Sequence, residues 1–261
     1  MKNEKTKTYL LEIILSVLLL ITLITSKKIT YITLALLLLT YTIILKITIT
    51  QKNIFSIYKK QILTSMISLG LIYIGIFYMF GFYAYNFSKT PTLLNLNTLY
   101  RYIIPLTSII ISTEEIRQAF ILKNGTIKIL KKQIDLSKII LFVNMVLIDV
   151  LIYIRLYDIK KLDDFITVIG FIVFASVSCN MLYNYITKRY GNKSIIAYKL
   201  ITTLYIYIIP IIPNMYIYFR SFIRMIYPYI IYITLENTYS KSNYVIANKN
   251  KNIIRSEERR V

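Results

Sequence analysis

Long apolar stretches alternate with short lysine-rich segments along the chain. Two of these stretches, Ile29–Leu45 and Gln61–Ser88, contain no charged residue. The second is longer than the roughly 20 residues that an α-helix needs to cross a bilayer. The pattern therefore predicts an all-α fold, that of a polytopic helical membrane protein with about eight transmembrane helices. The expected spans are 9–26, 29–49, 62–86, 102–122, 138–155, 165–187, 195–213 and 215–235.

The lengths of the connections predict how these spans are grouped. Only the segment Ser26–Lys28 separates the first two spans, so residues 9–49 are expected to form a tight two-helix hairpin. The remaining spans are expected to form a helical bundle over residues 62–236. No connection is long enough to fold as a soluble domain of its own, so residues 1–236 are interpreted as one polytopic membrane domain.

The C-terminal part of the chain is marked by prolines and then by polar residues. Pro210 and Pro213 predict a turn or a sharp kink between the last two spans, because proline removes a backbone donor. Residues 237–254 are expected to be a polar tail or linker without regular structure. Residues 255–261 match the conceptual translation of a sequencing adapter, so we expect the natural sequence to break off near Ile254.

The charge of the chain fits a membrane protein. The mean hydropathy is +0.58 and the net charge is +20. The basic residues stand at the ends of apolar runs, where they set topology, so the charge does not indicate nucleic-acid binding. With the N-terminus in the cytoplasm, the inner segments hold 20 Lys and Arg and the outer segments 9. This bias predicts a multi-pass protein of the bacterial plasma membrane, with a cytoplasmic N-terminus and the lipid bilayer as partner. The first apolar run lacks a small-x-small cleavage site, so it is interpreted as a transmembrane helix and not as a signal peptide.

The amino-acid inventory excludes several chemistries. The chain has one cysteine, Cys179, and no histidine. A disulfide within the chain, a histidine metal site and a Ser-His-Asp or Cys-His mechanism are therefore ruled out for these residues. A serine–lysine pair needs a buried lysine, and nearly every lysine stands at an expected loop or helix end. The sequence predicts no catalytic residue, no cofactor and no metal ligand.

One charged cluster lies late in the fourth expected span. Glu114 and Arg117 are three residues apart, so they share a helix face and are able to pair, whereas Glu115 points about 100° away and needs another partner. The cluster is interpreted either as a polar site near the cytoplasmic face or as an ion pair that fixes helix register. Intramembrane CAAX-type proteases also carry paired glutamates, but their Glu-Glu-x-x-x-Arg pattern and their histidines are absent.

Further polar residues lie inside two later spans. Asp149, with Asn144 five residues earlier, is expected to hydrogen-bond a neighbouring helix or to line a polar cavity. Asn180 in the sixth span has the same interpretation. Glu12 and Glu236 lie near span ends and are assigned no role.

Scattered motifs carry a resemblance to a known family. They are Gly81-Phe-Tyr83, Ser88–Pro91, Tyr102–Pro105 leading to Glu114, Leu147–Tyr153, Pro228 and the stretch 190–214, which includes Tyr198, Tyr205, Tyr207, Pro210, Pro213 and Asn214. From about Gly70 to Glu236 the chain resembles large signal peptidase I homologues of low-GC Firmicutes and related bacteria. The stretch 190–214 is the most specific part of this resemblance.

The resemblance implies a function for the parent protein. Such enzymes are serine endopeptidases that remove signal peptides from exported proteins on the outer side of the membrane. Their serine lies in a Ser-x-Ser-Met-x-Pro-like motif after a further helix, and a lysine or histidine base follows. Here the one Ser-Met pair is Ser65–Met66, with Ser68 in place of the proline. We therefore expect a membrane region that lacks the catalytic domain and is itself inactive. Its implied partners are signal-peptide-bearing preproteins or the secretion channel.

Two other classes of protein remain open. A complete small transporter, or a polysaccharide or lipid flippase or ligase, would use Asp149, Glu114 and Arg117 along a substrate path. Transporters commonly show interrupted helices at matching places in two halves, and Pro105 is the nearest counterpart of the later proline pair. A nonenzymatic membrane scaffold is the third possibility.

Overall fold

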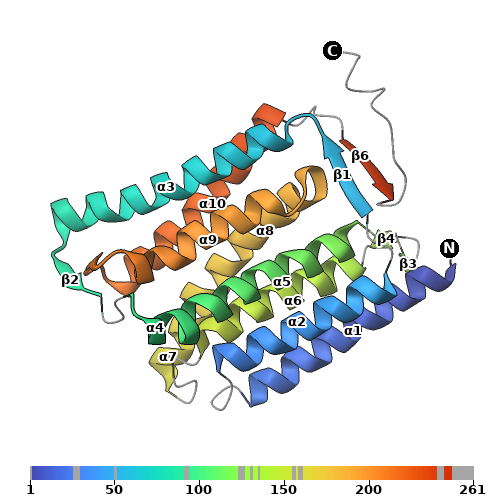
Figure 1. Ribbon diagram of the computed structural model, residues 1–261, viewed down its shortest axis with the longest axis horizontal. Helices are drawn as coiled ribbons and strands as arrows, with labels where there is room; N and C mark the ends of the chain where they lie inside the picture. Colours follow the sequence, from blue (N-terminus) through green and yellow to red (C-terminus); the bar gives the residue numbers. More distant parts are fainter. Residues whose placement is uncertain are drawn as a thin grey trace.

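The computed structural model describes residues 2–25, 30–49, 52–90, 94–122, 127–129, 132–134, 136–154, 157, 161–239 and 244–248. They form an all-α fold whose helices run back and forth along one long axis (Figure 1). The α-helices are α1 (Lys2–Ile24), α2 (Tyr31–Thr48), α3 (Lys59–Ala84), α4 (Leu96–Thr98), α5 (Ile104–Ile121), α6 (Leu136–Tyr153), α7 (Leu162–Thr167), α8 (Phe174–Tyr190), α9 (Lys193–Ile208) and α10 (Ile217–Tyr239).

Two π-helical segments join short helices to long ones. Leu99–Ile103 connects α4 to α5, and Val168–Val173 connects α7 to α8. Each of these two combinations is therefore one continuous helical rod. Such π-helical turns occur mostly as single insertions within α-helices. The sequence pattern does not reveal them, because the apolar residues continue through both segments.

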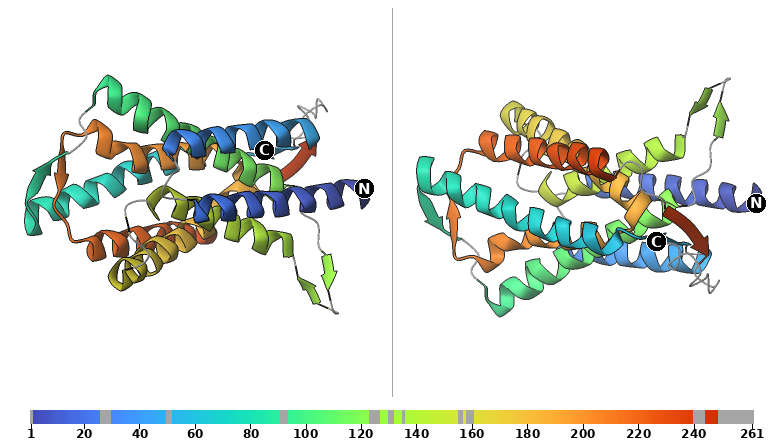
Figure 2. Two further views of the ribbon diagram at one scale, coloured as in Figure 1. Left: turned by 90° about the horizontal axis from the view of Figure 1, so that it is seen from below. Right: turned by 90° about the horizontal axis from the view of Figure 1, so that it is seen from above.

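Each expected span overlaps one α-helix or one of these rods. The largest difference is at α1, which begins at Lys2 instead of residue 9, and α9 ends at Ile208 instead of continuing to residue 213. Pro210 and Pro213 follow immediately, so the expected break is confirmed. The first two helices do not pack chiefly on each other. The main partner of α1 is α6 and that of α2 is α5 (Figure 2), so the hairpin is inserted into the bundle and not closed on itself.

Three short antiparallel ladders tie the connections together, and the sequence did not predict them. The strands are β1 (Lys52–Ser56) with β6 (Tyr244–Asn248), β2 (Phe87–Lys89) with β5 (Ile211–Pro213), and β3 (Ile127–Ile129) with β4 (Lys132–Ile134). In addition, α10 continues to Tyr239. The expectation of an irregular tail after Glu236 is therefore wrong for the described residues 237–239 and 244–248.

Helix α5 lies at the centre of the bundle. It packs against α2, α6, α8 and α9. One apolar core joins α1, α2, α5 and α6, with Leu38, Ile116 and Met145 fully buried. A second core joins α3, α8, α9 and α10 around Met66 and Ile186. The polar face of α5 meets α8 and α9 between these two cores.

The outer faces of several helices carry large apolar side chains. Examples on α1, α2 and α3 are Leu10, Ile14, Ile21, Leu36, Ile43, Leu71 and Ile72. Among the described residues, four helical stretches are long and apolar enough to cross a membrane, namely Lys7–Ile24, Tyr31–Thr48, Lys59–Ala84 and Asp164–Tyr190. Helices of that length and composition, with apolar residues on their outer surface, are typical of proteins that lie in a bilayer.

Candidate functional site: a buried polar network beside a cavity

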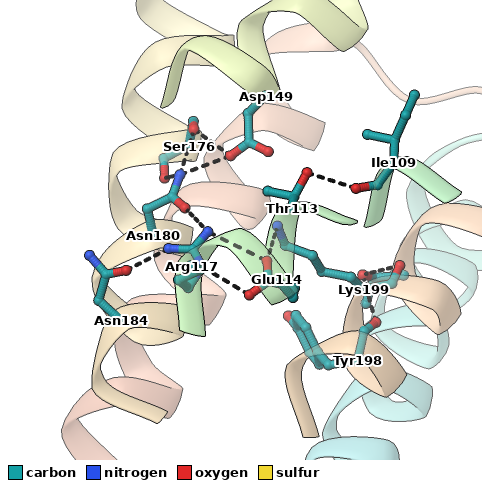
Figure 3. Close-up of polar contacts among 11 residues, drawn as sticks. Ile109, Thr113, Glu114, Arg117, Asp149, Ser176, Asn180, Asn184, Tyr198 and Lys199 are labelled. Atoms are coloured by element: carbon teal, nitrogen blue, oxygen red, sulfur yellow. Dashed lines mark hydrogen bonds and ion pairs between the residues drawn. The ribbon is translucent and has the colours of Figure 1, made fainter. Parts of the chain in front are cut away.

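Glu114 and Arg117 form an ion pair on the inner face of α5. Arg117 Nε donates to Glu114 Oε2 at 2.8 Å, and both side chains are fully buried. The pairing expected from their three-residue spacing is therefore confirmed. The pair faces α8 and α9, which supply its remaining partners (Figure 3).

Lys199 on α9 is the second cation of this site. Its Nζ lies 2.6 Å from Glu114 Oε1 and 4.5 Å from the centre of the Tyr183 ring. One carboxylate is thus shared between two cations. The 20 Lys and Arg residues assigned above to the inner segments include Lys199 and Arg117, and the structure places both inside helices. Without these two residues, the inner segments still hold more lysine and arginine than the outer segments.

Two asparagines of α8 extend the network from Arg117. The guanidinium donates to Asn184 Oδ1 and to Asn180 Oδ1, each at 2.5 Å. Because the Asn180 oxygen accepts from Arg117, its amide nitrogen is free to donate elsewhere. It donates to Asp149 Oδ2 at 2.8 Å and to the Ser176 backbone oxygen at 2.9 Å.

Asp149 on α6 ends this chain of contacts. Its Oδ2 accepts from Ser176 Oγ at 2.6 Å as well as from Asn180. The expectation that Asp149 hydrogen-bonds a neighbouring helix is confirmed. The network therefore connects α9, α5, α8 and α6 through Lys199, Glu114, Arg117, Asn180 and Asp149.

Burial makes this network energetically demanding. Removing a charge from water costs several kcal/mol, which is offset only if each charge is paired and hydrogen-bonded. Glu114 and Arg117 meet this condition through contacts to two helices, α8 and α9. Such a network fixes the relative position of the helices, because a shift of any one helix would leave a buried charge without a partner.

A cavity of about 200 Å³ lies beside the network. Asp149 and Lys199 line it on the network side, and Arg220 and Arg224 of α10 line it as well. Arg224 donates to the Tyr153 hydroxyl at 2.8 Å and lies over the same ring at 4.5 Å. Arg220 is exposed, so the cavity reaches the molecular surface at that residue. Asp149 therefore lines a cavity, as the second expectation for it required, but most of the cavity wall is apolar.

Glu115 does not belong to the network. It forms a separate ion pair with Lys46 of α2, with 2.5 Å between Oε2 and Nζ. Both side chains are partly exposed. Glu115 therefore has a partner other than Arg117, as its position on the helix predicted. This partner, Lys46, lies away from the cavity.

The residues of the family-like stretch fall into two groups. Tyr198, Tyr205 and Tyr207 come from α9 and line the cavity. The others lie in the α9–α10 connection, where Pro213 belongs to β5 and Asn214 N donates to Asn86 O at 2.8 Å. Pro210 O accepts from Thr90 N at 2.9 Å in the same connection. These residues do not form a single site.

Sequence reasoning missed several buried or cavity-lining charges. Lys199, Arg220 and Arg224 lie inside the last two expected spans, and the sequence pattern singled out none of them as part of a site. Glu12 was assigned no role, yet it is fully buried and accepts a hydrogen bond from Ser137 Oγ of α6. The available signal was the helical register of Lys199, which lies six residues inside α9 and thus roughly 9 Å from its first residue.

The described residues contain no group of three or more His, Cys, Asp or Glu side chains that could hold a metal ion. The chemistry that the site offers is the placement of charges of both signs in a partly apolar cavity. Comparison with known protein families, curated proteins and solved structures found no match to this chain.

Proposed function

We propose that this protein is a multi-pass protein of the bacterial plasma membrane in which eight helical segments cross the bilayer. The observation that carries this proposal is the distribution of polarity. Glu114, Arg117 and Lys199 lie inside the bundle, whereas large apolar side chains cover the outer helix faces. In a bilayer, ionisable residues face the bundle interior and pair with one another.

The same distribution explains why only some helices are apolar along their whole length. Helices α5 and α9 carry charged residues, but Glu114 and Arg117 are fully buried and Lys199 nearly so. Helix α10 also carries charged residues, and two of them, Arg220 and Arg224, line the cavity. None of these helices therefore needs to present these charges to lipid chains, and a crossing by each of them is compatible with the energetics of the bilayer.

The orientation of the protein follows from the charges at the two ends of the bundle. The N-terminus, β1, β6 and the α8–α9 turn lie at one end, and β2 and β5 lie at the other (Figure 1). Lysine and arginine are more frequent at the first end. By the positive-inside rule, the first end is cytoplasmic and the β2–β5 end is outside.

Labelling with a membrane-impermeant maleimide tests the topology in a Cys179→Ser background. Lys89→Cys, at the end of β2, is expected to react in intact spheroplasts. Asn192→Cys at the α8–α9 turn is expected to react only after the membrane is permeabilised. The reverse pattern would contradict the orientation, and reaction of both residues in intact spheroplasts would contradict the crossings between them.

For the activity, we propose the membrane region of a signal peptidase I-like serine endopeptidase that processes signal peptides. The support is the resemblance of residues 190–214, together with structural requirements at two of them. Tyr190 is fully buried, and Gly191 adopts φ +88°, which favours glycine. The proposal assigns no catalytic residue to these 261 residues. Its partners are signal-peptide-bearing preproteins or the secretion channel.

Two measurements test the peptidase proposal. The purified chain is expected not to cleave a signal-peptide substrate. Cleavage that a single serine substitution abolishes would show that a catalytic serine lies within this chain. A photo-crosslinking residue at Tyr216, on the outer end of the bundle, is expected to capture a preprotein during export, and its failure to do so under active export would count against the proposal.

The cavity favours a second candidate, a small transporter or a polysaccharide or lipid flippase-type protein. Asp149, Lys199 and Arg224 line one cavity between helices, as charged groups along a substrate path do. In that case Asp149→Asn should abolish transport while the protein still inserts into the membrane. Unchanged transport by this variant would exclude a path through Asp149.

A further inference from the structure

The cavity is lined by charged groups of both signs, and Asp149, Arg220 and Arg224 form no ion pair with one another. Both hydrogen bonds that Asp149 accepts fall on Oδ2, so its Oδ1 has no hydrogen-bond partner among the described residues. Among the described residues, the guanidinium of Arg224 hydrogen-bonds the Tyr153 hydroxyl, and that of Arg220 donates to the Pro213 backbone oxygen at 3.4 Å. No ion pair joins either arginine to a described carboxylate. Lys199 differs, because Glu114 neutralises it.

These charges are arranged in order along the bundle axis. Asp149 precedes Tyr153 by one turn of α6, and Arg220 precedes Arg224 by one turn of α10, each turn being about 5.4 Å. Helix α6 ends and α10 begins toward the β2–β5 end of the bundle (Figure 1). Since Arg224 meets Tyr153, the carboxylate lies deepest, Arg224 follows, and Arg220 lies at the surface.

The cavity wall between these charges is apolar and aromatic. Ile152, Leu106 and Ile110 contribute aliphatic surface, and the rings of Tyr153 and Tyr183 face the cavity as well. Aromatic faces attract cations, and tyrosine hydroxyls donate hydrogen bonds to oxygen anions. The wall therefore accommodates both a small ammonium group and an oxyanion joined by a short carbon chain.

We propose that the cavity binds a zwitterionic headgroup of the phosphoethanolamine class, with the ammonium at Asp149 and the phosphate at Arg224 and Arg220. A simple anion would leave Asp149 unpaired and be repelled by it, and a simple cation would be repelled by the two guanidiniums. A zwitterion satisfies both, and a guanidinium is suited to phosphate because it donates two parallel hydrogen bonds. The two charges of phosphoethanolamine are separated by a distance comparable to one helical turn.

The headgroup has two possible sources, a phospholipid of the bilayer or a soluble ester. In the lipid, the phosphate end carries the acyl chains, which would leave the cavity at its surface opening near Arg220. The inference about a lipid rests on the proposed membrane location, whereas binding of the soluble ester does not. The labelling experiment on Lys89→Cys and Asn192→Cys tests the location by itself, so failure of one proposal is distinguishable from failure of the other.

The test measures lipid retention by the full chain. The protein is purified from nanodiscs that contain equal amounts of phosphatidylethanolamine, phosphatidylcholine and phosphatidylglycerol, and bound lipids are counted by native mass spectrometry. We expect phosphatidylethanolamine to be enriched about tenfold over both others. Phosphatidylcholine has the same charges but no ammonium hydrogen to donate to Asp149, and phosphatidylglycerol has no cation.

Variants that remove either the negative or the positive charge of the cavity test both halves of the proposal. Asp149→Asn and Arg224→Gln are each expected to remove the enrichment, while Arg224→Lys retains part of it. Two matched controls lie outside the cavity and should retain it, namely Glu115→Gln, which faces Lys46, and Arg189→Gln, which contacts the ring of Tyr185. Helical content by circular dichroism confirms that each variant is folded.

A separate arm uses soluble phosphoethanolamine with the protein in detergent. Saturable binding without lipid enrichment would identify a soluble ester as the source and support the same headgroup chemistry. Equal retention of the three lipids together with no binding of phosphoethanolamine would overturn the proposal. Enrichment that persists in both Asp149→Asn and Arg224→Gln would also overturn it, because the lipid would then bind elsewhere.

Discussion

Lys199 Nζ lies 2.6 Å from Glu114 Oε1, and this contact joins two helices that are far apart in the sequence. Glu114 also accepts from Arg117 Nε at 2.8 Å, so two cations of the interior share a single buried carboxylate. The contact places the amine of Lys199, which belongs to α9, at the centre of the bundle. It makes Glu114 the residue on which the charge balance of the network depends.

Glu114→Gln is expected to destabilise the protein by about 3–5 kcal/mol, because it leaves buried cations without their counter-charge. The measurement is unfolding by sodium dodecyl sulfate titration in mixed micelles, followed by circular dichroism. Glu115→Gln is the matched control on the next residue. Its ion pair with Lys46 is partly exposed, so the expected loss is about 0–1 kcal/mol. Equal losses for the two variants would contradict the central role of Glu114.

Adding Lys199→Met to Glu114→Gln should recover part of the lost stability. Removing both partners of a buried pair is less costly than removing one, because no unpaired charge remains from that pair. A double-mutant cycle measures the coupling between the two residues directly. An additive result would show that the amine and the carboxylate are not in contact in the folded protein.

Asn180→Ala is expected to cost about 1–3 kcal/mol, because Arg117 loses an acceptor and Asp149 loses a donor in a buried site. Asn184 also accepts from Arg117, but it is less buried, and among the described residues it is Asn180 that donates to Asp149. Asn184→Ala should therefore cost less. Unfolding of both variants under identical conditions provides the comparison, and a larger loss for Asn184→Ala would contradict the order of contacts described here.

The sequence predicted the helices and one contact of the network. Runs of apolar residues locate the helices within a few residues because every crossing helix needs them. The pairing of Glu114 with Arg117 follows from local spacing. Contacts between helices have no such rule, so the partners of Asp149 and Lys199 were not named. Lys199 was misplaced for a physical reason, since a single lysine near a basic turn has the same local pattern whether it faces water or a carboxylate.

The connections were harder to predict than the helices. The ladder between β2 and β5 has three residues in each strand, which is too short for an alternating pattern to be recognised. Gly81 illustrates what the sequence did not reveal. A Cβ at this position would lie 2.8 Å from Pro213 Cβ and 2.9 Å from the Phe87 ring. Two residues of the family-like motifs are therefore neighbours because α3 packs closely on β5.

Gly81→Ala tests this close approach. The added methyl group would collide with Pro213 and Phe87, which belong to paired strands and have little room to move. We expect a loss of about 1–3 kcal/mol from overpacking. Gly75→Ala is the matched control in the same helix, because nothing lies within 4 Å of its added Cβ. Alanine there should be neutral or slightly stabilising, and unfolding titrations of the two variants decide the comparison.

A disulfide across the β2–β5 ladder tests the arrangement of the outer end. Ser88 lies directly opposite Ile212 in the antiparallel register, a position where two cysteines are close enough to bond. In a Cys179→Ser background, the double variant Ser88→Cys with Ile212→Cys is expected to form an intramolecular disulfide on mild oxidation. A protease site inserted at Asn192 in the α8–α9 turn, between the two cysteines, would then release fragments that separate only after reduction. The mispaired variant Ser88→Cys with Ile209→Cys is the control and should cross-link much less.

If the control cross-links as well as the paired variant, the register between β2 and β5 is wrong. If neither variant cross-links, the α3–α4 and α9–α10 connections do not meet at one end of the bundle.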